Sequence, residues 1–249
     1  MKTDQGLWDK VWMKQATSSP EHRKAIEEEI KSVRWRKIEK ELLNAGRAFE
    51  GLKVIELGSG RGIVSLLMGL KGAEVTLLDS SEVALGRAGL LFKDFGCDAR
   101  FRNADIFDLP GDILGQFDIA MSFGLVEHFR GEERQQAMNA HYSVLRSRGT
   151  CFISVPNRFC LPYRFWKKSL ELRRRWAYGF EDPFTRRELM KKAQAANFTS
   201  CTIIGSSFLN AIDRFFLFSA LSRIGINTEV SSFLDYYFGY ALVLVGHRL

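Results

Sequence analysis

Residues 54–62 read Val-Ile-Glu-Leu-Gly-Ser-Gly-Arg-Gly, and this stretch decides the fold. The short apolar run at 52–57 predicts a buried parallel strand. Three glycines follow, Gly58, Gly60 and Gly62, and the apolar segment after them predicts the start of a helix. A strand, a glycine turn and a helix in this order bring the backbone close to a nucleotide-like ligand, because glycine has no Cβ to block the approach.

The spacing of the glycines argues against a dinucleotide. A dinucleotide fingerprint is G-x-G-x-x-G and places a pyrophosphate at the helix N-terminus. Here the spacing is Gly58-x-Gly60-x-Gly62, and Glu56 precedes it. A carboxylate at that place repels a pyrophosphate but suits a ligand with a positive centre and no phosphate. A nicotinamide oxidoreductase is therefore disfavoured, and the remaining alternative is a tight strand-to-helix turn without a ligand.

A second apolar strand at 75–79 ends in Asp79. An acidic residue about 20 positions past such glycines can accept hydrogen bonds from both hydroxyls of a ribose. The alternative role of Asp79 is to cap the helix predicted at 82–95.

Three further segments follow in order. The first, 102–107, contains Asp105 and Ile106. The second is a buried strand from Phe117 that continues into Gly-Leu-Val-Glu-His-Phe at 124–129, and the third, 149–157, is a strand after a glycine turn.

Together these segments across 52–157 resemble the class I S-adenosylmethionine-dependent methyltransferases, in the small-molecule branch with type 11/25 methyltransferase domains. The resemblance implies an α/β fold: a Rossmann-like, seven-stranded, mostly parallel sheet with helices on both faces and an antiparallel last strand. It implies S-adenosyl-L-methionine as the cofactor. Asp105 would meet the adenine amino group, unless it is an ordinary loop residue, and Ile106 would cover the ring. The implied cofactor-binding set is Glu56, Gly58, Ser59, Gly60, Gly62, Asp79, Ser80, Asp105, Ile106 and Ser122.

Methyl transfer from a sulfonium needs alignment of the reacting atoms and exclusion of water. An oxygen or nitrogen acceptor also loses a proton, which calls for a general base. His128 follows the fourth strand and is the candidate base, although a lone histidine is also common as a structural residue. Glu127 would orient His128 or contact the amino group of the donor. No metal site is predicted, since the four cysteines lack C-x-x-C spacing and indicate buried, reduced thiols.

Two domains of the chain can be delimited. Residues 1–50 predict a helical N-terminal arm, and Trp8 and Trp12 on its apolar face are either core anchors or parts of a lid. Residues 51–249 form the methyltransferase domain, with substrate-side insertions at about 157–184 and 207–238. In the first insertion, the spacing of Phe165, Ser169, Leu172 and Trp176 predicts one face of a basic amphipathic helix. A capping box of Thr185 with Glu188 predicts the next helix.

The net charge of +7 is concentrated in 157–200, which holds eleven Lys and Arg against four acidic residues. Three interpretations stay open. The acceptor is an anionic or lipid-like small molecule; the basic segment makes peripheral contact with a membrane; or the charge is a solvated face, and the apolar insertion forms a homodimer interface. Nucleic acid is disfavoured, because the D/N-P-P-Y/F segment of amino-methylating enzymes is absent.

The predicted function is methylation of a small-molecule or lipid-like acceptor, with oxygen favoured over nitrogen or carbon. The alternative is a catalytically silent module on the same fold that binds S-adenosylmethionine or docks on a membrane. The N-terminal residues lack the apolar core of a signal peptide, and no apolar run reaches the ~20 residues of a membrane span. The expected location is the cytoplasm, with the inner membrane face as the peripheral site.

Overall fold

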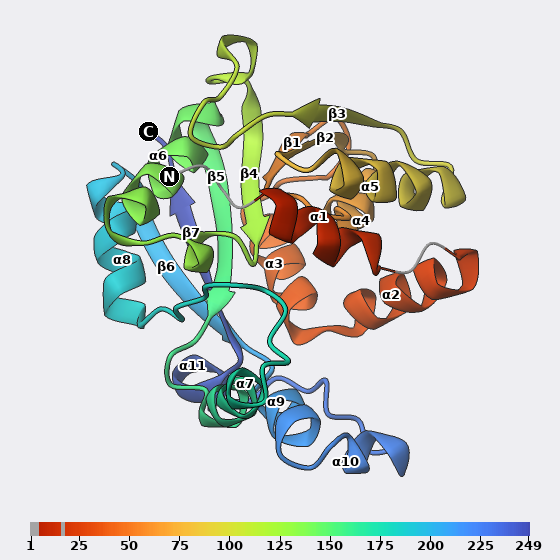
Figure 1. Cartoon of the computed structure of the whole chain (residues 1–249). Helices are drawn as coiled ribbons and strands as arrows, with labels where there is room; N and C mark the ends of the chain where they lie inside the picture. Colours follow the sequence, from red (N-terminus) through yellow and green to blue (C-terminus); the bar gives the residue numbers. More distant parts are fainter. Residues whose placement is uncertain (1–4, 16–17) are drawn as a thin grey trace.

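A seven-stranded sheet forms the centre of the molecule (Figure 1). The computed structural model describes residues 5–15 and 18–249. The strand order is β3-β2-β1-β4-β5-β7-β6, and the fold class predicted from the sequence is confirmed. The strands are β1 (Lys53–Leu57), β2 (Glu74–Asp79), β3 (Ala99–Asn103), β4 (Phe117–Phe123), β5 (Leu145–Pro156), β6 (Thr199–Ser206) and β7 (Ala241–His247).

The first five strands are parallel, and the last one reverses. β7 lies between β5 and β6 and pairs with both in antiparallel fashion, as predicted for the last strand. The strand of the glycine turn, β1, lies between β2 and β4. The order of the strands reverses at β1 and β4, and in open α/β sheets ligands bind at the carboxyl ends of the strands at such a point.

Helices cover both faces of the sheet, and each face has its own hydrophobic core. One face packs against α6 (Gly131–Val144) and α8 (Arg186–Ala195), through residues such as Met138 and Leu189. The other face packs against three helices, through residues such as Trp35, Leu66 and Phe92. These helices are α3 (Val33–Asn44), α4 (Ile63–Gly69) and α5 (Glu82–Asp94).

The N-terminal arm is helical, as expected. It contains α1 (Gln5–Met13) and α2 (Ser19–Lys31) ahead of α3. Figure 1 shows α1 passing in front of the central strands beside α5. The arm is fastened by His22, whose Nδ1 lies 2.6 Å from Asp94 Oδ2 of α5.

The two insertions build a lobe at the carboxyl ends of the strands (Figure 1). It contains α7 (Leu161–Leu172), α9 (Phe208–Phe215), α10 (Ala220–Arg223) and α11 (Asp235–Phe238). Its small core joins Cys160 and Tyr163 of the first insertion to Ala211 and Phe215 of the second. The lobe therefore forms from segments that are far apart in the sequence.

Helix α7 ends earlier than predicted, and the predicted apolar face is exposed. Phe165 and Leu172 are 62% and 75% exposed, and Trp176 lies beyond the end of the helix. The buried side of α7 instead carries Tyr163 and Lys167. The helix is thus apolar on its exposed side at Phe165 and Leu172, while the side toward the lobe carries one aromatic and one basic residue.

The predicted capping box is half correct. Thr185 is the N-cap of α8, and its Oγ1 accepts a hydrogen bond from the backbone N–H of Glu188 at 3.1 Å. The Glu188 side chain does not return to the cap but pairs with Arg134 of α6 at 2.5 Å. An ion pair with a buried guanidinium replaces the second half of the box.

We expect His141 of α6 to make the fold acid-sensitive. Its side chain is fully buried, its Nδ1 donates to the carbonyl of Ala137 at 2.7 Å, and burial lowers its pKa from 6.5 to about 4. Between pH 6.5 and pH 4 the unfolded chain takes up a proton that the folded chain refuses. The free energy of unfolding should therefore fall by about 2 to 3 kcal/mol as the pH is lowered from 7 to 4.5.

Urea unfolding at the two pH values tests this expectation. His141→Gln should be less stable than the wild type at pH 7 but should lose less stability on acidification. Equal losses in both proteins would show that other groups cause the acid sensitivity.

Candidate active site

All three glycines of the turn between β1 and α4 are in the left-handed region. Gly58, Gly60 and Gly62 have φ values of 60°, 53° and 67°, which residues with a Cβ rarely adopt. A Cβ on Gly60 would also lie 2.4 Å from Cη2 of Trp12. The turn therefore needs glycine for its backbone conformation and for the close approach of α1.

Asp79 ties this turn to the end of β2. Its Oδ2 accepts from the N–H of Gly60 at 2.8 Å, and its Oδ1 accepts from the N–H of Ser81 at 2.9 Å. The helix-capping role belongs to Ser81, whose Oγ accepts from the N–H of Ala84. Burial raises the pKa of Asp79, because the carboxylate is only 7% exposed. The alternative role of Asp79 as the cap of α5 is thus filled by its neighbour.

An inner cavity opens beside Asp79. Among the predicted cofactor-binding residues, Gly58, Asp79, Ser80 and Ile106 line it. The other lining residues are Trp8, Trp12, Gly124, Leu125 and Phe129. The cavity is thus walled by the turn, the end of β2, the loop after β3 and α1.

The remaining predicted residues occupy different places. Ser59 and Gly60 line a second cavity described below. Asp105 lines neither cavity, and its Oδ1 accepts from the N–H of Phe107 at 3.0 Å. Glu56 lies buried under the turn, where Ser65 Oγ donates to its Oε2 at 2.5 Å and burial raises its pKa to about 8. Ser122 is buried in β4 and faces neither cavity.

Helix α1 closes the inner cavity from outside. The rings of Trp8 and Trp12 stack with centroids 6.3 Å apart, and both line the two cavities. The edge of Trp8 also meets the ring of His128, with centroids 4.8 Å apart. Asp9 of the same helix accepts a hydrogen bond from Ser81 Oγ at 2.5 Å. Both tryptophans are therefore part of the site wall.

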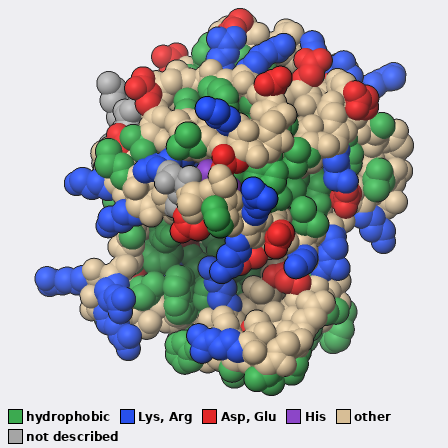
Figure 2. Space-filling model, turned by 90° about the vertical axis from the view of Figure 1, so that its right-hand side faces the viewer, with side chains coloured by type: hydrophobic (Ala, Val, Ile, Leu, Met, Phe, Trp, Pro, Cys, Tyr) green, Lys and Arg blue, Asp and Glu red, His purple; other side chains and the backbone are tan. Residues whose placement is uncertain are grey.

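An outer cavity of about 310 Å³ continues from the inner one toward the lobe. Glu127 and His128 face it from the short helical turn η2 (Val126–His128) after β4. The lobe contributes aromatic side chains and two charged ones: Tyr163, Trp166, Trp176, Tyr178, Phe215, Tyr240, Glu181 and Arg214. Figure 2 shows hydrophobic side chains around a hollow in the lower half of the molecule, with Lys and Arg beside it.

His128 is held by the backbone rather than by Glu127. Its Nδ1 donates to the carbonyl of Phe180 at 2.6 Å, and burial lowers its pKa to about 4. The imidazole is therefore neutral at pH 7, with Nε2 as its remaining nitrogen. Within the described part of the chain no hydrogen bond joins Glu127 to His128, so the predicted orienting role of Glu127 is filled by Phe180.

Glu127 is one of two acids in the outer cavity. Its side chain is 2% exposed, and burial, with the nearby charge of Glu181, raises its pKa to about 8. Glu181 accepts from the hydroxyl of Tyr163 at 2.5 Å and lies 3.3 Å from Nζ of Lys167. Sequence reasoning missed Glu181 and Tyr163, because they lie within the first insertion and belong to no motif.

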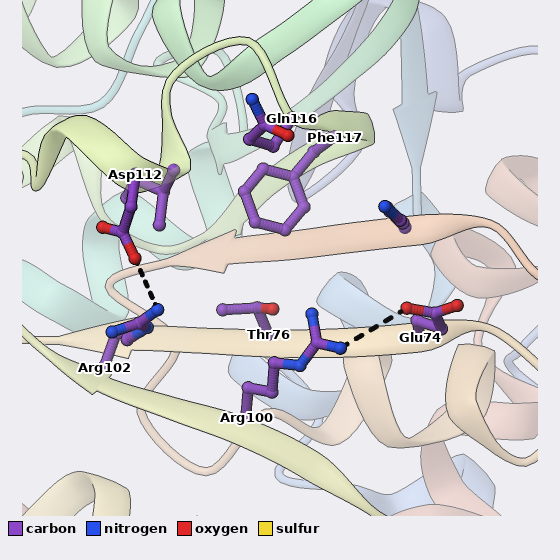
Figure 3. A pocket seen from close by; sticks show the side chains of 9 residues that line it. Glu74, Thr76, Arg100, Arg102, Asp112, Gln116 and Phe117 are labelled. Carbon is purple, nitrogen blue, oxygen red and sulfur yellow. Dashed lines mark hydrogen bonds and ion pairs between the residues drawn. The ribbon is translucent and has the colours of Figure 1, made fainter.

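A third cavity lies at the amino ends of the strands, away from the glycine turn (Figure 3). Lys53, Glu74 and Phe117 line it, and each is the first residue of its strand. Its charges are already paired, Arg102 with Asp112 at 2.6 Å and Arg100 with Glu74 at 3.7 Å. It is therefore separate from the glycine turn and offers no comparable chemistry.

Comparisons with known proteins agree with this geometry. Residues 54–149 match a family model described as a methyltransferase domain. A ubiquinone biosynthesis O-methyltransferase from Azotobacter vinelandii is 28% identical over 154 residues, which cover 62% of this chain and 61% of that protein. The protein of the same name from Aromatoleum aromaticum is 29% identical, with 66% and 70% covered. The chain thus spans about three fifths of the length of the first of these relatives.

A solved structure extends the likeness over most of the chain. The magnesium protoporphyrin IX methyltransferase from Synechocystis PCC 6803, crystallised with bound S-adenosylhomocysteine, aligns with a TM-score of 0.60 at 18% identity. The alignment covers 91% of this chain and 86% of that one. At this identity, the likeness concerns the fold.

Proposed function

Because the chain belongs to the class I S-adenosylmethionine-dependent methyltransferases, we propose that it methylates a hydroxyl group of a small, aromatic or lipid-like acceptor. The observation that carries the proposal is that the inner and outer cavities share part of their lining. Trp8, Trp12, Gly58 and Gly124 line both of them, so the two cavities adjoin at the glycine turn, and ligands bound in them would lie next to each other. A methyl donor and an acceptor need this arrangement for in-line transfer.

We infer that S-adenosylmethionine, which supplies an electrophilic methyl group on its sulfonium, binds at the glycine turn, where the inner cavity lies. A Cβ on Gly58 or Gly60 would meet the side chains of Leu125 and Trp12, which line the cavity, and Asp79 lines it from the end of β2. We assign the ribose hydroxyls to Asp79 and one face of the adenine to Ile106. Asp105 would reach the adenine amino group only by releasing the N–H of Phe107. Glu56 and Ser122 would act indirectly, by positioning the turn and β4.

The outer cavity supports an acceptor with an apolar body. Its aromatic side chains favour a planar ring or an acyl tail, and Arg214 at its edge favours an anionic group. Oxygen is the favoured acceptor atom, since the relatives described above are named as O-methyltransferases. Glu127 and His128 are the side chains next to which the acceptor would lose its proton. A pKa of about 4 makes neutral His128 a weak base when it acts alone.

We also propose that the lobe docks on an anionic lipid surface. The rings of Phe165 and Phe216 stack at 6.2 Å, so the exposed sides of α7 and α9 form one apolar surface. Leu172 and Phe218 extend it, being 75% and 72% exposed. The basic run 173–175 follows directly. Exposed apolar side chains beside Lys and Arg are typical of interfacial contact with anionic lipids. Among the described residues, no helix has both the length and the apolar character to cross a bilayer.

Calorimetry with S-adenosylhomocysteine, with NAD in parallel, tests the function. We expect micromolar binding of the first and none of the second. Methyl transfer would then be assayed with hydroxylated aromatic acceptors carrying a tail, presented in phosphatidylglycerol or in phosphatidylcholine vesicles. Turnover that is faster in the anionic vesicles is the expected result.

Each other outcome has a distinct meaning. Absence of S-adenosylhomocysteine binding would overturn the proposed function. Binding without turnover of any acceptor would favour the catalytically silent module. Equal rates in both kinds of vesicle, with dimers in solution, would assign the exposed surface to a second copy of the chain.

A further inference from the structure

Three metal-ligating side chains meet in the outer cavity. Glu127 and His128 come from η2, and Glu181 comes from the segment after α7. One nitrogen of His128 and one carboxylate oxygen of each glutamate all lie within 4.8 Å of one another. A cation between them could reach all three with small side-chain shifts, since metal–ligand distances are about 2.0 to 2.4 Å.

His128 is prepared as a ligand. A metal-binding histidine is normally neutral and donates its other ring N–H to a carbonyl or carboxylate, which fixes the ring. The Nδ1 of His128 makes this bond with the carbonyl of Phe180 at 2.6 Å. The lone pair on Nε2 is therefore free for a ligand.

Each of the two glutamates has a carboxylate oxygen that is available to bind a cation. Glu127 Oε2 is buried and has no hydrogen-bond partner among the described residues. A buried polar atom without a partner is costly, which points to an occupant of the cavity that the Glu127 carboxyl group pairs with. The hydroxyl of Tyr163 and the ammonium of Lys167 both contact Glu181 through Oε1, leaving its Oε2.

We propose that Glu127, His128 and Glu181 bind one divalent cation of the Mn²⁺ or Zn²⁺ kind, and that the acceptor oxygen takes one of its open positions. Two carboxylates and one imidazole are ligands that such cations accept, and three protein ligands leave room for substrate. The inference deepens the proposed function, on which its catalytic part rests. It departs from the sequence analysis, which predicts no metal site from the spacing of the cysteines and does not consider Glu181, which is distant from Glu127 and His128 in sequence.

The cation would help the acceptor hydroxyl to lose its proton, which neutral His128 alone does poorly. Coordination lowers the pKa of a hydroxyl, so its proton leaves to water without a strong base in the cavity. The acceptor oxygen then forms the new O–CH₃ bond while the C–S bond of the sulfonium breaks, and its electron pair returns to sulfur as a neutral thioether. Atoms and charges balance without any oxidant or reductant.

Lys167 sets a limit on the affinity. Its Nζ lies 3.3 Å from Glu181 Oε1 and donates to the backbone carbonyl of Glu181 at 2.5 Å. A fixed ammonium so close to the site repels a second cation. The cluster nevertheless keeps a net negative charge when both glutamates are ionised.

Titration with Mn²⁺ alone, followed by electron paramagnetic resonance, tests the site without any acceptor. The full chain should bind one Mn²⁺. Glu127→Gln and Glu181→Gln, which keep the side-chain volume, should each weaken the binding at least about tenfold. Glu171→Gln is the matched control, since Glu171 also pairs with Lys167, at 3.7 Å, but lies outside the cluster. It should bind Mn²⁺ like the wild type.

Calorimetry with S-adenosylhomocysteine on the same proteins separates the two proposals. Glu181→Gln and Glu171→Gln should keep the wild-type affinity for it, which also shows that they are folded. Wild type that binds S-adenosylhomocysteine but no Mn²⁺ up to millimolar concentration would overturn the metal site and leave the proposed function intact. Variants that bind Mn²⁺ as tightly as the wild type would also overturn it. Mn²⁺ binding without S-adenosylhomocysteine binding would overturn the proposed function and leave the metal site in place.

Discussion

Asp79→Ala is expected to lower the affinity for S-adenosylhomocysteine about 100-fold. The carboxylate faces the inner cavity from the end of β2, where we assign both ribose hydroxyls to it. A hydrogen bond to a charged group contributes about 1.5 to 3 kcal/mol, so the loss of two corresponds to about 3 kcal/mol and two orders of magnitude in Kd. Calorimetric titration measures the change directly.

The controls must separate the ribose from the turn, because Asp79 also accepts from the N–H groups of Gly60 and Ser81. Ser81→Ala removes the cap of α5 and the contact with Asp9 but keeps the carboxylate. It should lose stability and only a few-fold in affinity. Unchanged binding by Asp79→Ala would exclude the ribose role, and an equal loss in both variants would assign the effect to the turn.

Gly205→Ala should cause the largest loss of stability, about 3 kcal/mol. A Cβ at this position of β6 would lie 1.8 Å from the backbone oxygen of Asp235, so the backbone itself must move. Lys37 links the same two elements, β6 and α11. Its Nζ lies 2.8 Å from the Gly205 carbonyl and 2.7 Å from Asp235 Oδ2. Overpacking against backbone cannot be relieved by a rotamer change. For a chain of this size, the melting temperature should fall by about 6 to 12 °C.

Gly86→Ala is the matched control for this substitution. Gly86 lies inside α5, and nothing lies within 4 Å of the position of its added Cβ. Alanine is the better helix former, so the variant should gain up to about 1 kcal/mol. Thermal unfolding of both variants measures the two changes in stability. A Gly205→Ala protein as stable as the wild type would show that the contact between β6 and α11 is loose.

The sequence predicted the structure where a local backbone conformation or contact requires one particular residue type. The turn at 58–62 needs glycine for its positive φ values, and an acid at the end of β2 ties that turn in place. Apolar runs predicted β1, β2, β4 and β5, because strands covered by helices on both faces are apolar throughout, whereas the exposed edge strand β3 has no such run. These features lie within short segments, so a local pattern is enough to find them.

The lobe and the acceptor side could not be predicted in the same way. The ring of His128 is oriented by the carbonyl of Phe180, and every residue has such a carbonyl. Glu181 joins Glu127 only because the first insertion folds back over the end of β4. The side of α7 that turns inward was set by Glu181, which lies outside the helix and pairs with Tyr163 and Lys167.

The pairing of β6 with β7 has a consequence for how such a chain can diversify. Ser206 and Ala241 are partners in the ladder, so the segment 207–240 leaves and re-enters the sheet at neighbouring positions. In topological terms it is an enlarged hairpin loop, and the entropy of closing a loop rises only slowly with its length. A segment of different length or sequence could be grafted between the same two residues while the glycine turn and Asp79 stay untouched. The part of the outer-cavity lining that 207–240 contributes could thus change by recombination at a single hairpin, without a change at the glycine turn.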